Sequence, residues 1–581
     1  MGTGFTIDTP LRVARYGISS VISLVDDVLI EQMRKYHCEK TGEPYEEITD
    51  SDSDARAHRI TAYLNLLDRL VTKQVEELRN SPFETGSEIT RYYEFLPESR
   101  LKDDYQTMLE THDPEEKAQR QIDLRKRVVP GTIDVNIMTK LDRDRYVKDV
   151  KLPKEFSDAK SALRGYARST VRSSIVCSAG MNREFYNYFT CFEDFFPDGD
   201  GVFRKKIILK VSDFRSAEIQ GKFLAKRGLW VSEFRIESGL NCGGHAFATK
   251  GILLGPIMEE FKEKKEKLVE MLHTLYNNAL NAIDRSGFDE PNTILFTVQG
   301  GIGTTRENEL LLKYYNVDST GWGTPFLLVP EAVNVDEAHL AKLSAACDGD
   351  VYLSESSPLG IPFWNLRNSS SEEMRRKRIS ENRPGSACRK NYLKLDTEIT
   401  DSPVCRASAY YQRRRLNLLE NENLTPEQYR AKKEDILNKS CICHDLAGAA
   451  TVKYSIDPQA TSAICCGPNI VNFTKITSLQ NMIDHIYGRI SLMANPERPH
   501  MFVSELMLYI EYFRKEVEKS SLDLTNLSEK YLNEFKENLL DGIENYLNLA
   551  EQFFEDQMEQ VIRDISTLKA ELENITLASR V

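Results

Sequence analysis

The sequence predicts an α/β fold, organised as a (β/α)8 barrel of the TIM type with helical extensions at both ends. Short runs of β-branched and aromatic residues alternate with amphipathic helical segments through the middle of the chain. Glycine-rich turns follow several of those runs. A doubly wound sheet would give the same alternation, but no G-x-G-x-x-G motif follows an early strand, which counts against a dinucleotide-binding fold of that kind.

The 581 residues divide by composition into four regions. Residues 1–160 are mainly helical and charge-rich, and they can contribute the first barrel strand. Residues 161–347 form the core of the predicted barrel. Residues 348–470 are irregular and rich in Pro, Gly, Ser and Cys, and residues 471–581 return to helical patterning.

In chain order, residues 5–25 are the best candidate for the first strand, by position and apolar character, and residues 57–80 repeat apolar side chains at helical spacing. The core then alternates in a regular way. The expected elements are strand 205–214, helix 216–228, strand 229–238, helix 255–283, strand 293–303, helix 305–315 and strand 319–329. The final segment, 527–575, carries apolar residues at spacings of three and four; it suits a helical cap on the main domain better than a coiled-coil arm.

Composition excludes some classes of protein. The formal charge is −13, so the clustered positive charge of a nucleic-acid-binding surface is missing. No stretch of 18 residues is apolar and free of charge, and the N-terminus lacks the apolar core of a signal peptide. We therefore expect a cytoplasmic protein without a membrane span, with its eleven cysteines as reduced thiols or metal ligands in preference to disulfides.

Two glycine-rich turns lie one βα unit apart. The first holds Gly300, Gly301 and Gly303 and runs into a helix that Thr304 or Thr305 can cap. The second holds Gly321, Gly323 and Thr324. Glycine lets the backbone approach a ligand closely, and amides at a helix N-terminus attract anions. In (β/α)8 enzymes the last two strand-to-helix loops together bind phosphate, so the pair predicts a phosphate site, whereas either turn alone is as well explained as a tight turn.

The succession CGGHAF, VQGGIGT and GWGTPFLLVPEA, within residues 205–332, resembles the FMN-dependent barrel family of nitronate monooxygenases and flavin enoyl reductases. The family places a small residue where this chain has Cys242, and it has a shorter segment between the histidine turn and the glycine turn. The resemblance covers less than a quarter of the chain.

The resemblance implies noncovalent FMN and a catalytic histidine. His245 would face the flavin and act as general acid or base, a role that its ordinary pKa near 6.5 suits; a histidine that caps a loop is the structural alternative. Arg235 and Glu237 share a strand face, and one of them can reach the pocket or form a salt bridge at the rim. The cofactor-binding residues would be Gly243, Gly244, Gly300, Gly301, Ile302, Gly303, Thr304, Gly323 and Thr324.

Six cysteines fall within 80 residues after the core, and His444 directly follows one of them, Cys443. We expect Cys405, Cys441, Cys443, Cys465 and Cys466 to supply ligands for zinc or an iron–sulfur cluster, if they bind metal at all. The usual C-x-x-C spacing is missing, so ordinary buried cysteines stay open as the alternative.

The sequence thus predicts an FMN-dependent oxidoreductase that acts on a small-molecule substrate, as a monooxygenase or an enoyl reductase. NAD(P)H would be the electron donor, or ferredoxin if an iron–sulfur cluster is present, and a homo-oligomer is compatible with the sequence. The alternative is a non-catalytic flavin-binding or scaffold protein whose helical C-terminus recruits a partner.

Overall fold

The computed structural model describes residues 3–139, 142–147, 150–243, 249–473, 475–553 and 558–577. Its centre is a parallel sheet of seven strands whose spatial order follows their order along the chain. The strands are β1 (Ser20–Ser23), β2 (Ile133–Ile137), β5 (Ser173–Cys177), β6 (Lys205–Val211), β7 (Val231–Glu237), β8 (Leu295–Gln299) and β9 (Ser319–Gly321). Each pairs in parallel with the next, as in the wall of a barrel.

The α/β prediction is confirmed. Over the described residues no pairing joins β1 to β9, and the strands follow an open curve, so the closed eight-stranded barrel goes beyond what the structure shows. The first two strands lie within residues 1–160. The chain leaves the sheet after Gly321, sooner than the sequence predicts. A short 3-10 helix follows at Thr324–Leu328, and Pro325 in its first turn has no N–H for a strand ladder.

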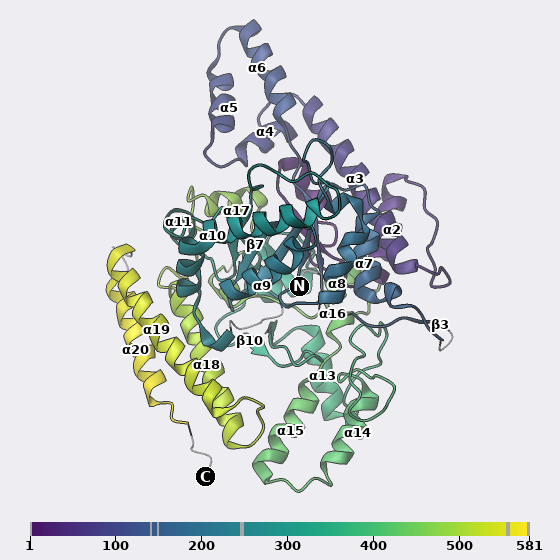
Figure 1. Ribbon diagram of the computed structural model, residues 1–581, viewed down its shortest axis with the longest axis vertical. Helices are drawn as coiled ribbons and strands as arrows, with labels where there is room; N and C mark the ends of the chain where they lie inside the picture. The colour runs from purple at the N-terminus through teal and green to yellow at the C-terminus, as the bar shows by residue number, and fades with distance from the viewer. Residues whose placement is uncertain are drawn as a thin grey trace.

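Helices connect successive strands of the curled sheet. They are α2 (Asp27–Thr41), α3 (Ala55–Asn80), α7 (Asp158–Ala167), α8 (Arg183–Tyr188), α9 (Phe214–Ala225), α10 (Leu254–Asn281) and α11 (Thr305–Glu309), the last continued by one π-helical turn over Leu310–Tyr314. Short helices α1 (Pro10–Val13), α4 (Glu88–Glu94), α5 (Arg100–Glu110) and α6 (Pro114–Arg127) complete the N-terminal region, and α5 and α6 project from the body in Figure 1.

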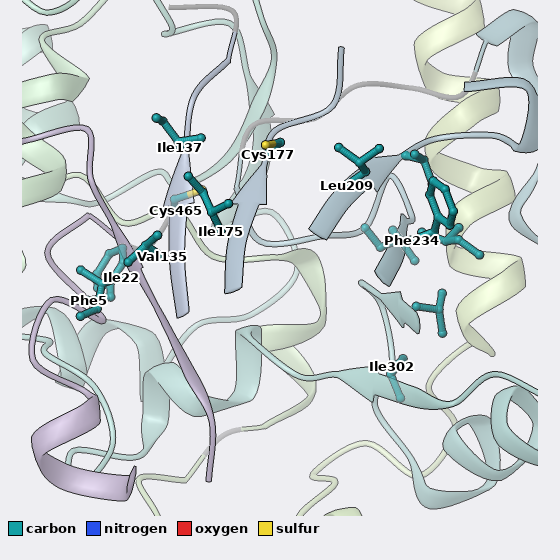
Figure 2. Close-up of a cluster of buried hydrophobic side chains, with 14 of the residues drawn as sticks. Phe5, Ile22, Val135, Ile137, Ile175, Cys177, Leu209, Phe234, Ile302 and Cys465 are labelled. Atoms are coloured by element: carbon teal, nitrogen blue, oxygen red, sulfur yellow. The ribbon is translucent and has the colours of Figure 1, made fainter. Parts of the chain in front are cut away.

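The outer face of the sheet is apolar because most residues at the alternate positions of its strands are Ile, Val, Leu or Phe. Figure 2 shows Ile22, Val135, Ile175, Leu209 and Phe234, which come from five successive strands. All five side chains are buried. The alternate residues of the same strands therefore point to the inner side of the curl, where their side chains can contact a ligand.

The region after the sheet packs back onto it. It contains α12 (Glu337–Ser344), the hairpin of β10 (Val351–Ser354) and β11 (Phe363–Leu366), and α13 (Ser370–Ser380), α14 (Ala409–Leu419), α15 (Pro426–Asn438), α16 (Ile442–Lys453) and α17 (Leu479–Ile486). A second small hairpin, β3 (Tyr146–Val147) with β4 (Val150–Lys151), lies between β2 and α7.

The three C-terminal helices are α18 (Met501–Ser521), α19 (Glu529–Phe553) and α20 (Met558–Asn574), and they run side by side along one flank of the molecule (Figure 1). They are a cap and not a free arm. The Tyr546 ring lies where a Cβ on Gly255 of α10 would sit, at 2.4 Å, and the Phe535 ring lies in the same way against Gly251. Backbone contact this close requires glycine on the main domain.

Candidate functional site

The inner side of the curl is polar at its carboxyl edge. Lys210 of β6 forms an ion pair with Glu237 of β7, with 2.8 Å between Nζ and Oε1. The same carboxylate oxygen accepts hydrogen bonds at 2.6 Å from the side-chain amides of Gln299 and Asn241. Charged groups this enclosed are stable only when they are paired. These four side chains therefore form an organised polar surface at the carboxyl edge.

A second group of polar side chains lies on the same face of the sheet, further from the carboxyl edge. The Glu233 carboxylate accepts from Arg235 Nε at 2.7 Å and from the Thr297 hydroxyl at 2.6 Å. Arg235 therefore forms a salt bridge with its strand neighbour, the alternative that the sequence left open. Across the sheet, burial raises the pKa of Asp134 to about 6, so this carboxyl titrates near neutral pH.

Two oxygen atoms at the ends of β1 and β2 lack partners. Ser23 pairs with Asn136 across the two strands, and their side chains share the inner face. Ser23 Oγ and Asn136 Oδ1 are both buried, and neither has a hydrogen-bond partner among the described residues. Buried polar atoms are nearly always satisfied, so this pair points to a ligand or water that the protein binds there.

The glycine turn after β8 packs tightly against the loop after β7. Gly300 and Gly301 have φ angles of 105° and 82°, a region that favours glycine. A Cβ on Gly300 would come within 2.9 Å of the Asn241 backbone nitrogen, and one on Gly301 within 2.7 Å of the Leu240 side chain. Both glycines are thus explained by loop packing alone, whether or not a ligand is bound.

The N-terminus of helix α11, which follows this turn, is already bound by a carboxylate of the same chain. Glu307 Oε2 accepts from the backbone amides of Gly303 and Thr304 at 2.8 and 3.1 Å, and Thr304 closes a capping box with it. Arg498 Nη1 donates to Glu307 Oε1 at 2.6 Å, and Arg498 Nη2 donates to the Gly301 carbonyl oxygen at 2.7 Å. The Glu307 carboxylate therefore occupies the amides that the sequence assigned to a phosphate.

The turn after β9 is more open. The nearest atom to a Cβ on Gly323 would be Cys242 Cβ, 3.8 Å away, and the backbone there is not in the left-handed region. Thr324 follows, and its hydroxyl accepts from the Gly467 amide at 3.1 Å. Ile302, also predicted to contact the cofactor, is a core residue at 4 % exposure, visible in Figure 2.

The histidine turn is described only in part. Gly243 is buried and has a φ of 135°. Gly244 and His245 lie outside the described residues, so the predicted catalytic base has no described position.

The predicted metal-binding cysteines separate into two places. Cys465 and Cys466 are buried in an extended segment beside the histidine turn, where the Cys242 thiol donates to the Cys465 carbonyl oxygen at 2.8 Å. A hydrogen bond from Cys242 lowers the pKa of the Cys465 thiol to about 6.

The remaining predicted ligands lie in the irregular region. There Cys405 hydrogen-bonds with Cys388, a residue outside the predicted ligand set, and Cys441 hydrogen-bonds with Cys443. All eleven cysteines are free thiols. Among the residues with described positions, no three His, Cys, Asp or Glu side chains form a group that could hold a metal ion, so metal binding stays a prediction.

No protein-family model and no curated protein matches this chain. The resemblance to the FMN-dependent barrel family thus rests on the three motifs alone. Among the described helices, none has the length and apolar character that a membrane span requires.

Sequence reasoning missed Ser23, Asn136, Lys210 and Gln299. The last two were detectable, because Lys210 and Gln299 lie within predicted strands 205–214 and 293–303 on the face opposite to the apolar residues. Ser23 and Asn136 were not, since β1 and β2 are short strands separated by more than 100 residues of helix-rich chain.

Proposed function

We propose that this protein is an FMN-dependent oxidoreductase whose site lies on the inner face and carboxyl edge of the curled sheet. One observation carries the proposal. The loops after three neighbouring strands, β7, β8 and β9, touch one another at the edge of a strand face that bears paired charges and two buried, unpartnered oxygens. Active sites of parallel barrels lie at this edge.

The strand order also favours a barrel. We propose that the seven parallel strands are part of a (β/α)8 barrel. Sequential parallel pairing from β1 to β9 is the order that barrel closure requires, whereas a doubly wound sheet reverses its order at a switch point.

The residues present fit FMN at some of the predicted positions and not at others. Gly303 and Thr304 already donate their amides to Glu307, so they are poor phosphate ligands. Gly323 has free space in front of it, and with Thr324 it would hold the phosphate. The Ser23 hydroxyl would donate to an acceptor of the bound ring, and Asn136 Oδ1 would accept from the ring N–H.

Bound FMN would supply an acceptor and donor of electrons. The chain's own part is to bind and orient. Lys210 and Glu237 would fix the polar end of a small-molecule substrate. His245, on the resemblance to nitronate monooxygenases and enoyl reductases, would move a proton to or from that substrate. NAD(P)H or ferredoxin would be the electron donor.

The first test is flavin binding. Protein purified from cells, or reconstituted with FMN, should carry about one FMN per chain, read by absorbance and by native mass spectrometry. Gly323→Val should lose FMN, because its new methyl groups enter the space assigned to the phosphate while the backbone angle allows a side chain. Gly199→Val is the matched control, since Gly199 also faces open space, and it should retain FMN.

Wild-type protein that stays free of flavin after reconstitution overturns the proposal. If the Gly323→Val variant binds FMN as tightly as the wild type, another loop must bind the phosphate.

The second test concerns His245. His245→Gln should retain FMN and thermal stability but lose turnover of a nitronate or an enoyl thioester by about two to four orders of magnitude, the range expected for a general acid or base. Unchanged turnover, or an unfolded variant, would assign the histidine a structural role.

A further inference from the structure

Two cysteines of the irregular region are held together by the backbone around them. The strand-like stretches at Ser386 and Ser408 form a parallel bridge. The Ser386 amide donates to the Ala407 carbonyl oxygen and the Ala409 amide donates to the Ser386 carbonyl oxygen, both at 3.0 Å. Each stretch carries one cysteine close to this bridge, Cys388 on the first and Cys405 on the second. Their proximity is therefore part of the fold.

The two thiols differ in their surroundings. The Cys405 side chain is buried, with 3 % exposure, and it hydrogen-bonds to Cys388. Cys388 is half-buried and also receives a hydrogen bond from the Asn391 amide, with Lys394 and Arg143 nearby. Cys388 is therefore the thiol that a small oxidant can reach, and Cys405 is the enclosed thiol beside it.

Small molecules can reach this pair. Cys388 and Cys405 both line one cavity, together with Lys394, Val404 and Tyr410. Reactive cysteines are electropositive, partly exposed and often adjacent to a second thiol, and this pair has all three features. The other pair of the region, Cys441 and Cys443, does not line this cavity in the described part of the chain.

We propose that Cys388 and Cys405 are a redox-active dithiol, in which Cys388 reacts with peroxides and Cys405 closes the disulfide. The assignment does not depend on flavin binding. A metal centre is the less favoured reading, because the thiols are arranged as pairs and no described group of three donors suits a metal ion.

The chemistry balances with hydrogen peroxide as the oxidant. The Cys388 thiolate attacks one peroxide oxygen, the O–O bond breaks, and hydroxide leaves, so the sulfur becomes a sulfenic acid. The Cys405 sulfur then attacks the Cys388 sulfur, the S–O bond breaks, and the OH group leaves as water with the Cys405 thiol proton, while the hydroxide of the first step takes a proton from solvent. Two thiols have lost two electrons, and one peroxide has gained them.

Trypsin makes the product easy to identify. Cleavage after Arg378, Arg389, Lys394 and Arg406 releases peptides 379–389 and 395–406, and each contains a single cysteine. Reduced full-length protein, treated with hydrogen peroxide and then alkylated, should yield these two peptides joined by a disulfide, and dithiothreitol should separate them. Cys405→Ser should instead give a sulfenic acid on Cys388 that dimedone traps.

The rate of iodoacetamide labelling provides a second measurement. The labelling rate of Cys388 in the reduced protein should fall after treatment with one equivalent of hydrogen peroxide and return after dithiothreitol, whereas the exposed Cys191, the internal control, should keep its rate. A Cys388 labelling rate that peroxide leaves unchanged, or a peroxide-induced disulfide that joins other cysteines, overturns the proposal. So does stoichiometric zinc or iron that protects Cys388 from labelling until a chelator removes it.

Discussion

Glu505 offers a sharp test of how the C-terminal cap is attached. Its side chain is 2 % exposed, and Oε2 accepts from the Tyr546 hydroxyl at 2.6 Å and from the Leu254 amide at 3.0 Å. Both donors are uncharged. Burial therefore outweighs the two hydrogen bonds and raises the pKa of Glu505 from its ordinary value of 4.5 to about 7.

The sign of the pH dependence follows from that direction. The folded state holds its proton at pH values where the unfolded state has released it, so the stabilising contribution is complete below pH 4.5 and is lost as the pH rises through about 7. At ~1.4 kcal/mol per pKa unit, the loss in the free energy of unfolding is about 3 kcal/mol between pH 4 and pH 8.

Glu505→Gln removes the titration and keeps an oxygen that can accept both hydrogen bonds. Urea unfolding of variant and wild type, followed by circular dichroism at each pH, should show the variant gaining about 3 kcal/mol relative to wild type from pH 4 to pH 8. Glu511→Gln, on the exposed side of the same helix, is the control and should show no such trend. A Glu505→Gln difference that stays constant with pH, or grows toward acid, would refute the reasoning.

Two further predictions concern packing around the site. Arg498→Met leaves the buried Glu307 carboxylate without its ion-pair partner and should lower the free energy of unfolding by about 3–5 kcal/mol, whereas adding Glu307→Gln should recover part of that loss; equal melting temperatures for the single and double variants would contradict this. Gly165→Val places a Cβ 2.7 Å from the Ala57 carbonyl oxygen, where α7 crosses α3, and should cost at least about 1–3 kcal/mol in thermal unfolding, whereas Gly199→Val should change nothing measurable.

The sequence by itself determined the repeating units of this protein. Strands β6, β7 and β8, the helices α9 and α10 between them, and the glycine turns after β8 and β9 all follow from local patterns. Those patterns are the alternation of apolar residues along a strand, the 3.6-residue repeat of a helix, and the backbone freedom of glycine. Each is read within a dozen or so residues, which is why the sequence reveals it.

The tertiary structure decided which of these local features can serve as a site. The predicted phosphate amides at Gly303 and Thr304 turn out to be satisfied by Glu307, because Arg498, almost 200 residues away, holds that carboxylate in place. The spacing of the cysteines suggested that Cys405 and Cys465 share one metal site. In the structure Cys405 contacts Cys388, whereas Cys465 contacts Cys242 in the loop after β7. Hydrogen bonds and burial between distant segments leave no local pattern, so only the folded chain discloses them.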